Sequence, residues 1–199
     1  KNDLHYEIEA KADVKFEIRI PAFAENLTVN GVPTKNAGLL RFNFRRSERT
    51  TLHVAFTVRP ALKQQPSGLY AAQMGSLVFS VPIRYEKIMH EYEKNGVERK
   101  YPYCDYEYKG LGDWNYAYCS DLLMAQERDV DDFPFSSERP PVALKAKMQK
   151  IDWGLEDGYE TVCAAYPASL EPLGGEEEIT LYPYGCAKLR MTQLPLLKP

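Results

Sequence analysis

The chain has 199 residues, a hydrophobic fraction of 44% and a formal net charge of −3. This length suits one large domain or two small ones, and the hydrophobic fraction is ordinary for a globular protein with a core. A nucleic-acid-binding protein would show a strongly basic balance or a basic stripe, so the charge argues against that class. No apolar run reaches the length of a membrane span. The chain starts at Lys1 without a signal-peptide pattern, which indicates a processed or truncated chain and leaves a periplasmic or secreted location open.

The first sixty residues predict about four strands, because apolar and polar residues alternate there with a period of two. The alternating runs lie at 14–20, 27–32, 40–44 and 52–58. Asn30-Gly31 is a hairpin signal, and Pro21 ends the first of these strands. Strands at this spacing are typical of a sandwich or a barrel.

Residues 60–68, with two prolines and one glycine, are the best candidate for a linker. We therefore expect the C-terminal part of a middle β-sandwich domain over 1–66 and a C-terminal β-sandwich domain over 67–199. The fold class is all-β, an antiparallel β-sandwich of one or two jelly-roll-like units.

The second part of the chain shows the same strand pattern. Its alternating runs lie at 77–83, 101–108, 142–148, 162–166, 179–182 and 187–192. The charged run 87–100 is a short helix or a protruding hairpin, and Asn95-Gly96 favours the hairpin. Residues 126–141 are charged and proline-rich, which predicts a surface crossing.

The sequence predicts no cofactor and no metal site. The four cysteines, Cys104, Cys119, Cys163 and Cys186, have neither CxxC spacing nor a neighbouring histidine. A Cys104–Cys119 disulfide and free buried thiols both remain open, with free thiols favoured. Asp129, Asp131 and Asp132 loosely resemble a calcium loop, but the glycine and terminal glutamate of an EF-hand are missing.

No catalytic residue is predicted either. The histidines at 5, 53 and 90 are scattered and are interpreted as surface residues. Nucleophile-elbow, P-loop and dinucleotide motifs are missing from the sequence. Asp105 and Glu107 share a strand face, yet any β protein offers such carboxylate pairs.

The sequence contains candidate residues for sugar binding. Trp114, Asn115 and Tyr116 follow a turn, and Tyr103 lies shortly before it. Such rings stack on sugar rings while a neighbouring amide bonds the hydroxyl groups. The favoured alternative is that these rings fill the core or an interdomain contact.

Four ordered stretches resemble the C-terminal part of proteins of glycoside hydrolase family 127, the β-L-arabinofuranosidase group. They are FEIRIPAFAENLTVNGVP (16–33), GSLVFSVPI (75–83), CDYEYKGLGDWNYAY (104–118), and PPVALKAKMQKIDW (140–153) with EITLYPYGCAKLRMTQLP (178–195). Two departures place the chain in a divergent branch. Ser76 stands where the family has proline, and the stretch RRSERTTLHV lacks the family's usual tryptophan.

The resemblance implies β-sandwich domains that follow an (α/α) barrel in a bacterial glycoside hydrolase. The family's active site, a cysteine nucleophile on zinc with glutamate partners, lies in that barrel and matches no position here. The implied function is therefore a non-catalytic accessory region that packs against the upstream barrel, shapes the rim of its cleft or forms a homodimer. A carbohydrate-binding module that uses Trp114 and nearby tyrosines is the alternative. The Pro183–Cys186 run is interpreted as a signature of the fold.

Overall fold

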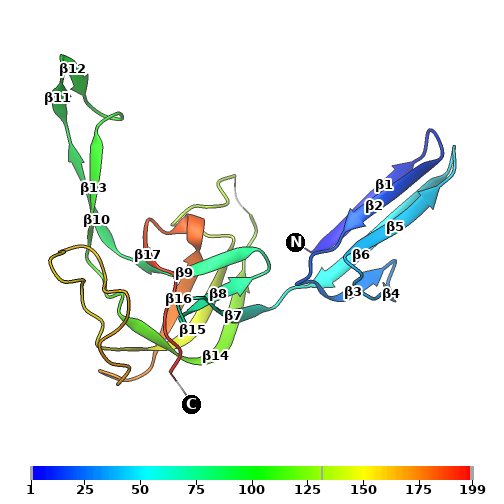
Figure 1. Ribbon diagram of the computed structural model, residues 1–199. Coiled ribbons are helices and arrows are strands. Elements are labelled where there is room, and N and C mark those ends of the chain that lie inside the picture. Colours follow the sequence, from blue (N-terminus) through cyan, green and yellow to red (C-terminus); the bar gives the residue numbers. More distant parts are fainter. Residues whose placement is uncertain (1, 131, 198–199) are drawn as a thin grey trace. The chain divides into compact units, whose positions relative to one another are not determined.

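The computed structural model describes residues 2–130 and 132–197, and it confirms an all-β fold of antiparallel strand ladders (Figure 1). Contacts divide the chain into two compact units, residues 1–59 (unit 1) and 60–199 (unit 2). No helix in the described part of the chain has the length and apolar character to cross a membrane.

Unit 1 contains two sheets that share one core. Its strands are β1 (Asp3–Glu9), β2 (Val14–Arg19), β3 (Glu25–Val29), β4 (Val32–Pro33), β5 (Leu39–Phe44) and β6 (Arg49–Thr57). One sheet has the order β1-β6-β3-β4, and the other pairs β2 with β5. The core takes residues from both sheets, such as Ile18 and Leu40 from one and Leu52 and Val54 from the other. The predicted turn is confirmed, because Asn30 and Gly31 have the positive φ angles of a tight hairpin.

Unit 2 is built on a seven-stranded sheet that nearly closes on itself. The strands are β7 (Pro60–Gln64), β8 (Tyr70–Met74), β9 (Leu77–Ile83), β14 (Tyr116–Glu127), β15 (Val142–Lys150), β16 (Glu177–Pro183) and β17 (Leu189–Met191). The order is β14-β15-β16-β9-β8-β7, with β17 also on β9, and the outer strands β14 and β7 contact each other. The predicted alternation of β15 is confirmed, since Val142, Leu144, Ala146 and Met148 are all buried.

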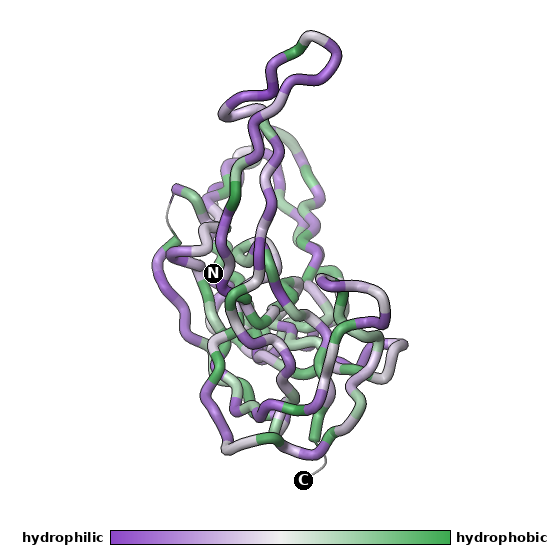
Figure 2. The backbone as a smooth tube through the Cα atoms, turned by 90° about the vertical axis from the view of Figure 1, so that its left-hand side faces the viewer, coloured by the Kyte–Doolittle hydropathy of each residue, from purple (hydrophilic) through white to green (hydrophobic). Residues whose placement is uncertain are grey.

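A long hairpin projects from this sheet (Figure 1). It contains β10 (Tyr85–His90), β11 (Tyr92–Lys94), β12 (Val97–Arg99) and β13 (Asp105–Gly110). Strand β10 pairs with β13 in a register that runs from Tyr85 opposite Gly110 to His90 opposite Asp105. This pairing confirms the hairpin predicted for the charged run. Its tip is mostly hydrophilic, as seen at the top of Figure 2.

Four local predictions are wrong in part or in full. The run predicted at 101–108 is a strand only from Asp105, because residues 101–104 form a turn. Pro60–Gln64 is strand β7 rather than linker, because a proline at the first residue of an edge strand removes no needed hydrogen bond. The predicted strand at 162–166 is reduced to an isolated bridge between Leu155 and Cys163. The last predicted strand pairs over Leu189–Met191 alone, since the 3-10 turn η1 (Tyr184–Cys186) precedes it. The assignment of 1–66 and 67–199 to particular sandwich domains stays a prediction.

Candidate functional site

The segment 183–193, called here the C-terminal strip, forms one wall of two surface grooves of unit 2. It starts where β16 ends at Pro183, turns through η1 and returns along β9 as β17. The turn comes close to another loop, because a Cβ atom on Gly185 would lie 3.3 Å from the Phe135 ring. A larger residue at 185 would therefore have to push that ring aside.

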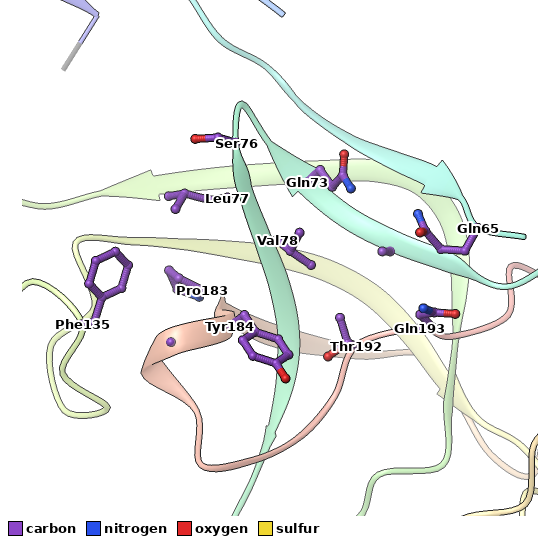
Figure 3. A pocket seen from close by; sticks show the side chains of 12 residues that line it. Gln65, Gln73, Ser76, Leu77, Val78, Phe135, Pro183, Tyr184, Thr192 and Gln193 are labelled. Atoms are coloured by element: carbon purple, nitrogen blue, oxygen red, sulfur yellow. The ribbon is translucent and has the colours of Figure 1, made fainter. Parts of the chain in front are cut away.

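The first groove, called the amide groove, has a volume of about 460 Å³ (Figure 3). Most of its side chains come from β8, β9 and the C-terminal strip, while Gln65 and Phe135 come from the loops after β7 and β14 (Figure 3). The lining includes Gln65, Gln73, Phe135, Tyr184, Thr192 and Gln193. The Ser67 hydroxyl donates a 2.8 Å hydrogen bond to Gln193 Oε1, which orients that amide.

The second groove, called the tryptophan groove, has a volume of about 900 Å³. The base of the hairpin and Trp114 line one part, and β17 and the loop 155–163 line the rest. Trp114 is half-buried and meets the buried Trp153 edge-on, with ring centroids 5.9 Å apart. Trp153 in turn donates from Nε1 to the Ala164 carbonyl at 2.8 Å, so it anchors the loop to the sheet. The Trp114 ring is thus held from behind by a fixed second ring.

Charged groups lie along the same groove. Glu107 lines it from β13, and Glu160 lines it from the facing loop. His90 is not part of the lining, but its Nε2 lies 3.0 Å from Glu107 Oε2. Arg190 donates from one terminal nitrogen to the carbonyls of Ala187, at 2.6 Å, and Lys188, at 3.0 Å. Carboxylates beside an aromatic ring can bond the hydroxyl groups of a sugar while its apolar face lies on the ring.

Arg190 connects the two grooves. Its side chain lines the tryptophan groove, and its guanidinium carbon lies 3.5 Å from the centre of the Tyr184 ring, which lines the amide groove. This distance is within the range of a cation–π contact. Substituting Arg190 would therefore change both grooves.

The structure places the four predicted sugar-binding residues differently from one another. Trp114 lines the tryptophan groove, while Asn115 uses its amide Nδ2 to donate to the Ile151 carbonyl at 2.7 Å. Tyr116 is 6% exposed, and burial raises its pKa. Tyr103 is 82% exposed. It lies just beyond the end of the β10–β13 ladder at which His90 pairs with Asp105. Tyr103 is not among the residues that line the tryptophan groove, and the carbohydrate-binding role of all four residues stays a prediction.

Two of the four cysteines, Cys119 and Cys186, have the character of structural thiols. All four are free in the structure, and Cys104 and Cys186 are buried. Burial raises the pKa of Cys186 and that of Cys119, which favours the protonated form at neutral pH. A nucleophilic thiol needs the opposite shift. The candidate calcium loop includes Asp131, which lies outside the described residues.

Sequence reasoning missed the groove-lining role of the C-terminal strip. Arg190, Tyr184 and Gln193 belong to the run that was interpreted as a fold signature. The available signal was the resemblance itself, because this run carries several of the polar side chains that the family pattern shares. The contribution of Gln65, Gln73 and Glu160 depends on tertiary contacts and had no sequence signal.

No protein-family model matches the chain, and no curated protein matches it either. Among solved structures, it is similar to Ara127N-Se, a GH127 β-L-arabinofuranosidase from Geobacillus stearothermophilus T6, with 15% identity and a TM-score of 0.55. The match covers 98% of this chain and 29% of that one. A second structure, described as a glycoside hydrolase, matches with 15% identity and a TM-score of 0.57 over 99% of this chain and 30% of its own. The chain therefore has the fold of a part that makes up about 30% of these larger glycoside hydrolases.

Proposed function

We propose that this chain is a non-catalytic β accessory region of a larger glycoside hydrolase of the β-L-arabinofuranosidase type. The observation that carries the proposal is the match of nearly the whole chain to about 30% of two glycoside hydrolases. The four ordered sequence stretches support it, since they point to the same group independently of the coordinates. In this proposal the rest of the parent protein contains an (α/α) barrel with the active site.

The C-terminal strip is the surface that we assign to the cleft side of the barrel. It presents Tyr184, which is 50% exposed, and the amide of Gln193 beside a groove of about 460 Å³. Rings and amides of this kind contact sugar units at the rim of a cleft while the barrel performs the chemistry. The accessory region would then act on substrate position without supplying an acid, a base or a nucleophile.

Hydrolysis by the purified chain is the direct test of the non-catalytic role. Aryl β-L-arabinofuranosides are incubated with the 199-residue chain and, in parallel, with the full-length parent enzyme. We expect release of the aryl group by the parent and none above background by the chain. If the purified chain releases the aryl group, and this activity co-purifies with the chain through two chromatographic steps, the proposal is overturned.

A second test addresses packing against the barrel. A shortened parent protein that ends before Lys1, and so lacks this region, should lose solubility or activity. Adding the separately purified chain should restore part of the lost solubility or activity. A truncated barrel with full activity and stability would contradict the accessory role.

A carbohydrate-binding module is the second candidate, and the tryptophan groove favours it. The half-buried Trp114 ring lies in a groove of about 900 Å³ together with Glu107 and Glu160. Native affinity gels that contain plant polysaccharides should retard the chain, and Trp114→Ala should remove the retardation. Tyr103→Ala is the matched control, because this exposed ring lies outside the groove and its loss should change nothing. Equal mobility on gels with and without polysaccharide would exclude the module.

A second copy of this chain, bound in a homodimer, is the remaining partner that we propose. Strand β1 is an edge of its sheet, and an unpaired edge invites pairing with a second chain. Sedimentation of the full chain at rising concentration should show a dimer, and a monomer at every concentration would contradict this.

A further inference from the structure

Two histidines and one aspartate, which are far apart in the sequence, meet on one face of unit 1. His5 on β1 lies directly opposite His53 on β6, and Asp3 precedes His5 by two residues on the same strand face. The core-facing residues of these strands, including Tyr6 and Leu52, alternate with them. The cluster therefore lies on the outer face of the sheet, where it is open to ions in solution.

The ligand atoms of the cluster converge. The two imidazole rings stack with centroids 4.2 Å apart and planes 10° from parallel. His5 Nε2 lies 3.3 Å from Asp3 Oδ1, and His53 Nε2 makes a hydrogen bond with the same oxygen. One potential ligand atom from each residue lies within 4.8 Å of the other two. An ion at the centre of this triangle needs side-chain adjustments and no change of the strand pairing.

The backbone beneath the cluster is fixed on both sides of β6. His53 N–H donates to Asn30 Oδ1 at 2.8 Å, and Asn30 N–H donates to the His53 carbonyl at 2.8 Å. On the other side, the β1–β6 ladder sets His5 against His53. Two rigid strands thus hold the three side chains, which reduces the entropy that a bound ion would have to offset.

We propose that Asp3, His5 and His53 bind a divalent transition-metal ion of the zinc type, which joins the edge strand β1 to β6. Two imidazole nitrogens and one carboxylate oxygen form a donor set that suits zinc, and water would complete a tetrahedral shell. An imidazole nitrogen must be unprotonated to bind the ion, so protons compete with the metal and the affinity falls as the pH is lowered. The exposed fractions, 71% for the His5 side chain and 37% for that of His53, leave a path for the ion.

The third histidine provides a matched control within the same chain. His90 also contacts a carboxylate, at 3.0 Å from Glu107, but the described residues provide no third ligand there. One imidazole and one carboxylate make a much weaker site. A metal effect that depends on His5 and His53 but not on His90 would therefore identify the cluster.

Isothermal titration of the full chain with zinc at neutral pH tests the proposal. We expect one ion per chain and a loss of affinity of at least about tenfold in each of His5→Ala and His53→Ala, with His90→Ala unchanged. Circular dichroism checks that each variant is folded, and His5→Gln replaces His5→Ala if it is not. No binding to the wild-type chain, or the same affinity in wild type and both cluster variants, would overturn the proposal.

A spectroscopic measurement separates the cluster from the cysteines. Cobalt bound to nitrogen and oxygen ligands gives weak visible bands, whereas cobalt on thiolates adds intense near-ultraviolet absorption. We expect the first spectrum from the full chain and its loss in His53→Ala. A thiolate spectrum that persists in His53→Ala would place the ion elsewhere and contradict the proposal.

Discussion

Replacing Trp153 with phenylalanine tests how the tryptophan groove is held together. Trp153 is 4% exposed, and its Nε1 donates to the Ala164 carbonyl at 2.8 Å. Phenylalanine cannot make this bond, and leaving a carbonyl without its partner costs about 1–2 kcal/mol. Its smaller ring also leaves a void and loses the edge contact with Trp114, which together cost about 1–2 kcal/mol. We therefore expect Trp153→Phe to lower the free energy of unfolding by about 2–4 kcal/mol.

Urea denaturation followed by circular dichroism measures this loss, and the same signal serves the double variant below, which contains no tryptophan. Trp114→Phe is the matched control, since no hydrogen bond from its indole is found among the described contacts and its ring is half-buried. The control should cost about 1 kcal/mol, and the double variant should reveal a coupling of about 0.5–1.5 kcal/mol between the rings. The reasoning is refuted if Trp153→Phe costs less than ~0.5 kcal/mol or no more than Trp114→Phe.

Three further predictions concern the sheets and the hairpin. Met148→Ala should lower the free energy of unfolding by about 2–5 kcal/mol in urea denaturation, because Met148 is fully buried. Lys147→Ala, on the other face of β15, should lower it by less than ~1 kcal/mol. Similar losses in the two variants would mean that the strand faces are misassigned. Gly112→Val should lower stability by about 1–3 kcal/mol in thermal unfolding, because its Cβ atom would lie 3.2 Å from a backbone nitrogen at the base of the hairpin, and an unchanged midpoint would contradict that close approach. The hydrogen bond from Arg41 lowers the pKa of Glu17 below its ordinary value of 4.5, so the pair stabilises the fold above pH 4.5 and this contribution is lost as the pH falls through the lowered pKa. Carbon NMR should find that lowered pKa, and Glu17→Gln should flatten the acid side of the stability profile; a Glu17 pKa at or above 4.5 would rule the effect out.

Strands with one buried face were predictable from the sequence. The alternation over 142–148 allows only one face of the strand to be buried, because a shift by one residue would bury lysines. The charged hairpin was predictable as well, since Asn95-Gly96 sets a tight turn between exposed strands. Local chemistry determines both elements, so neighbouring residues were sufficient to find them.

Features that depend on long-range pairing were missed. Strand β7 was interpreted as linker because Pro60 and Pro66 interrupt a short run, and its role as an edge strand appears only once β8 is placed beside it. Similarly, His5 and His53 looked like scattered surface histidines until the β1–β6 register placed them opposite each other. Of the predicted sugar-binding residues, Trp114 lines the tryptophan groove, whose facing loop the sequence did not reveal, because a turn can position a ring without showing what packs opposite it.

The central claim is that this chain is the accessory part of a longer hydrolase, and the reading frame upstream of the Lys1 codon tests it most directly. Sequencing the gene, together with the intact mass of the native protein, shows what the cell joins to this chain. We expect several hundred preceding residues with the pattern of a helical barrel, containing clustered cysteines and glutamates. A native protein whose mass equals that of this chain alone, or whose preceding residues encode an unrelated fold, would contradict the account.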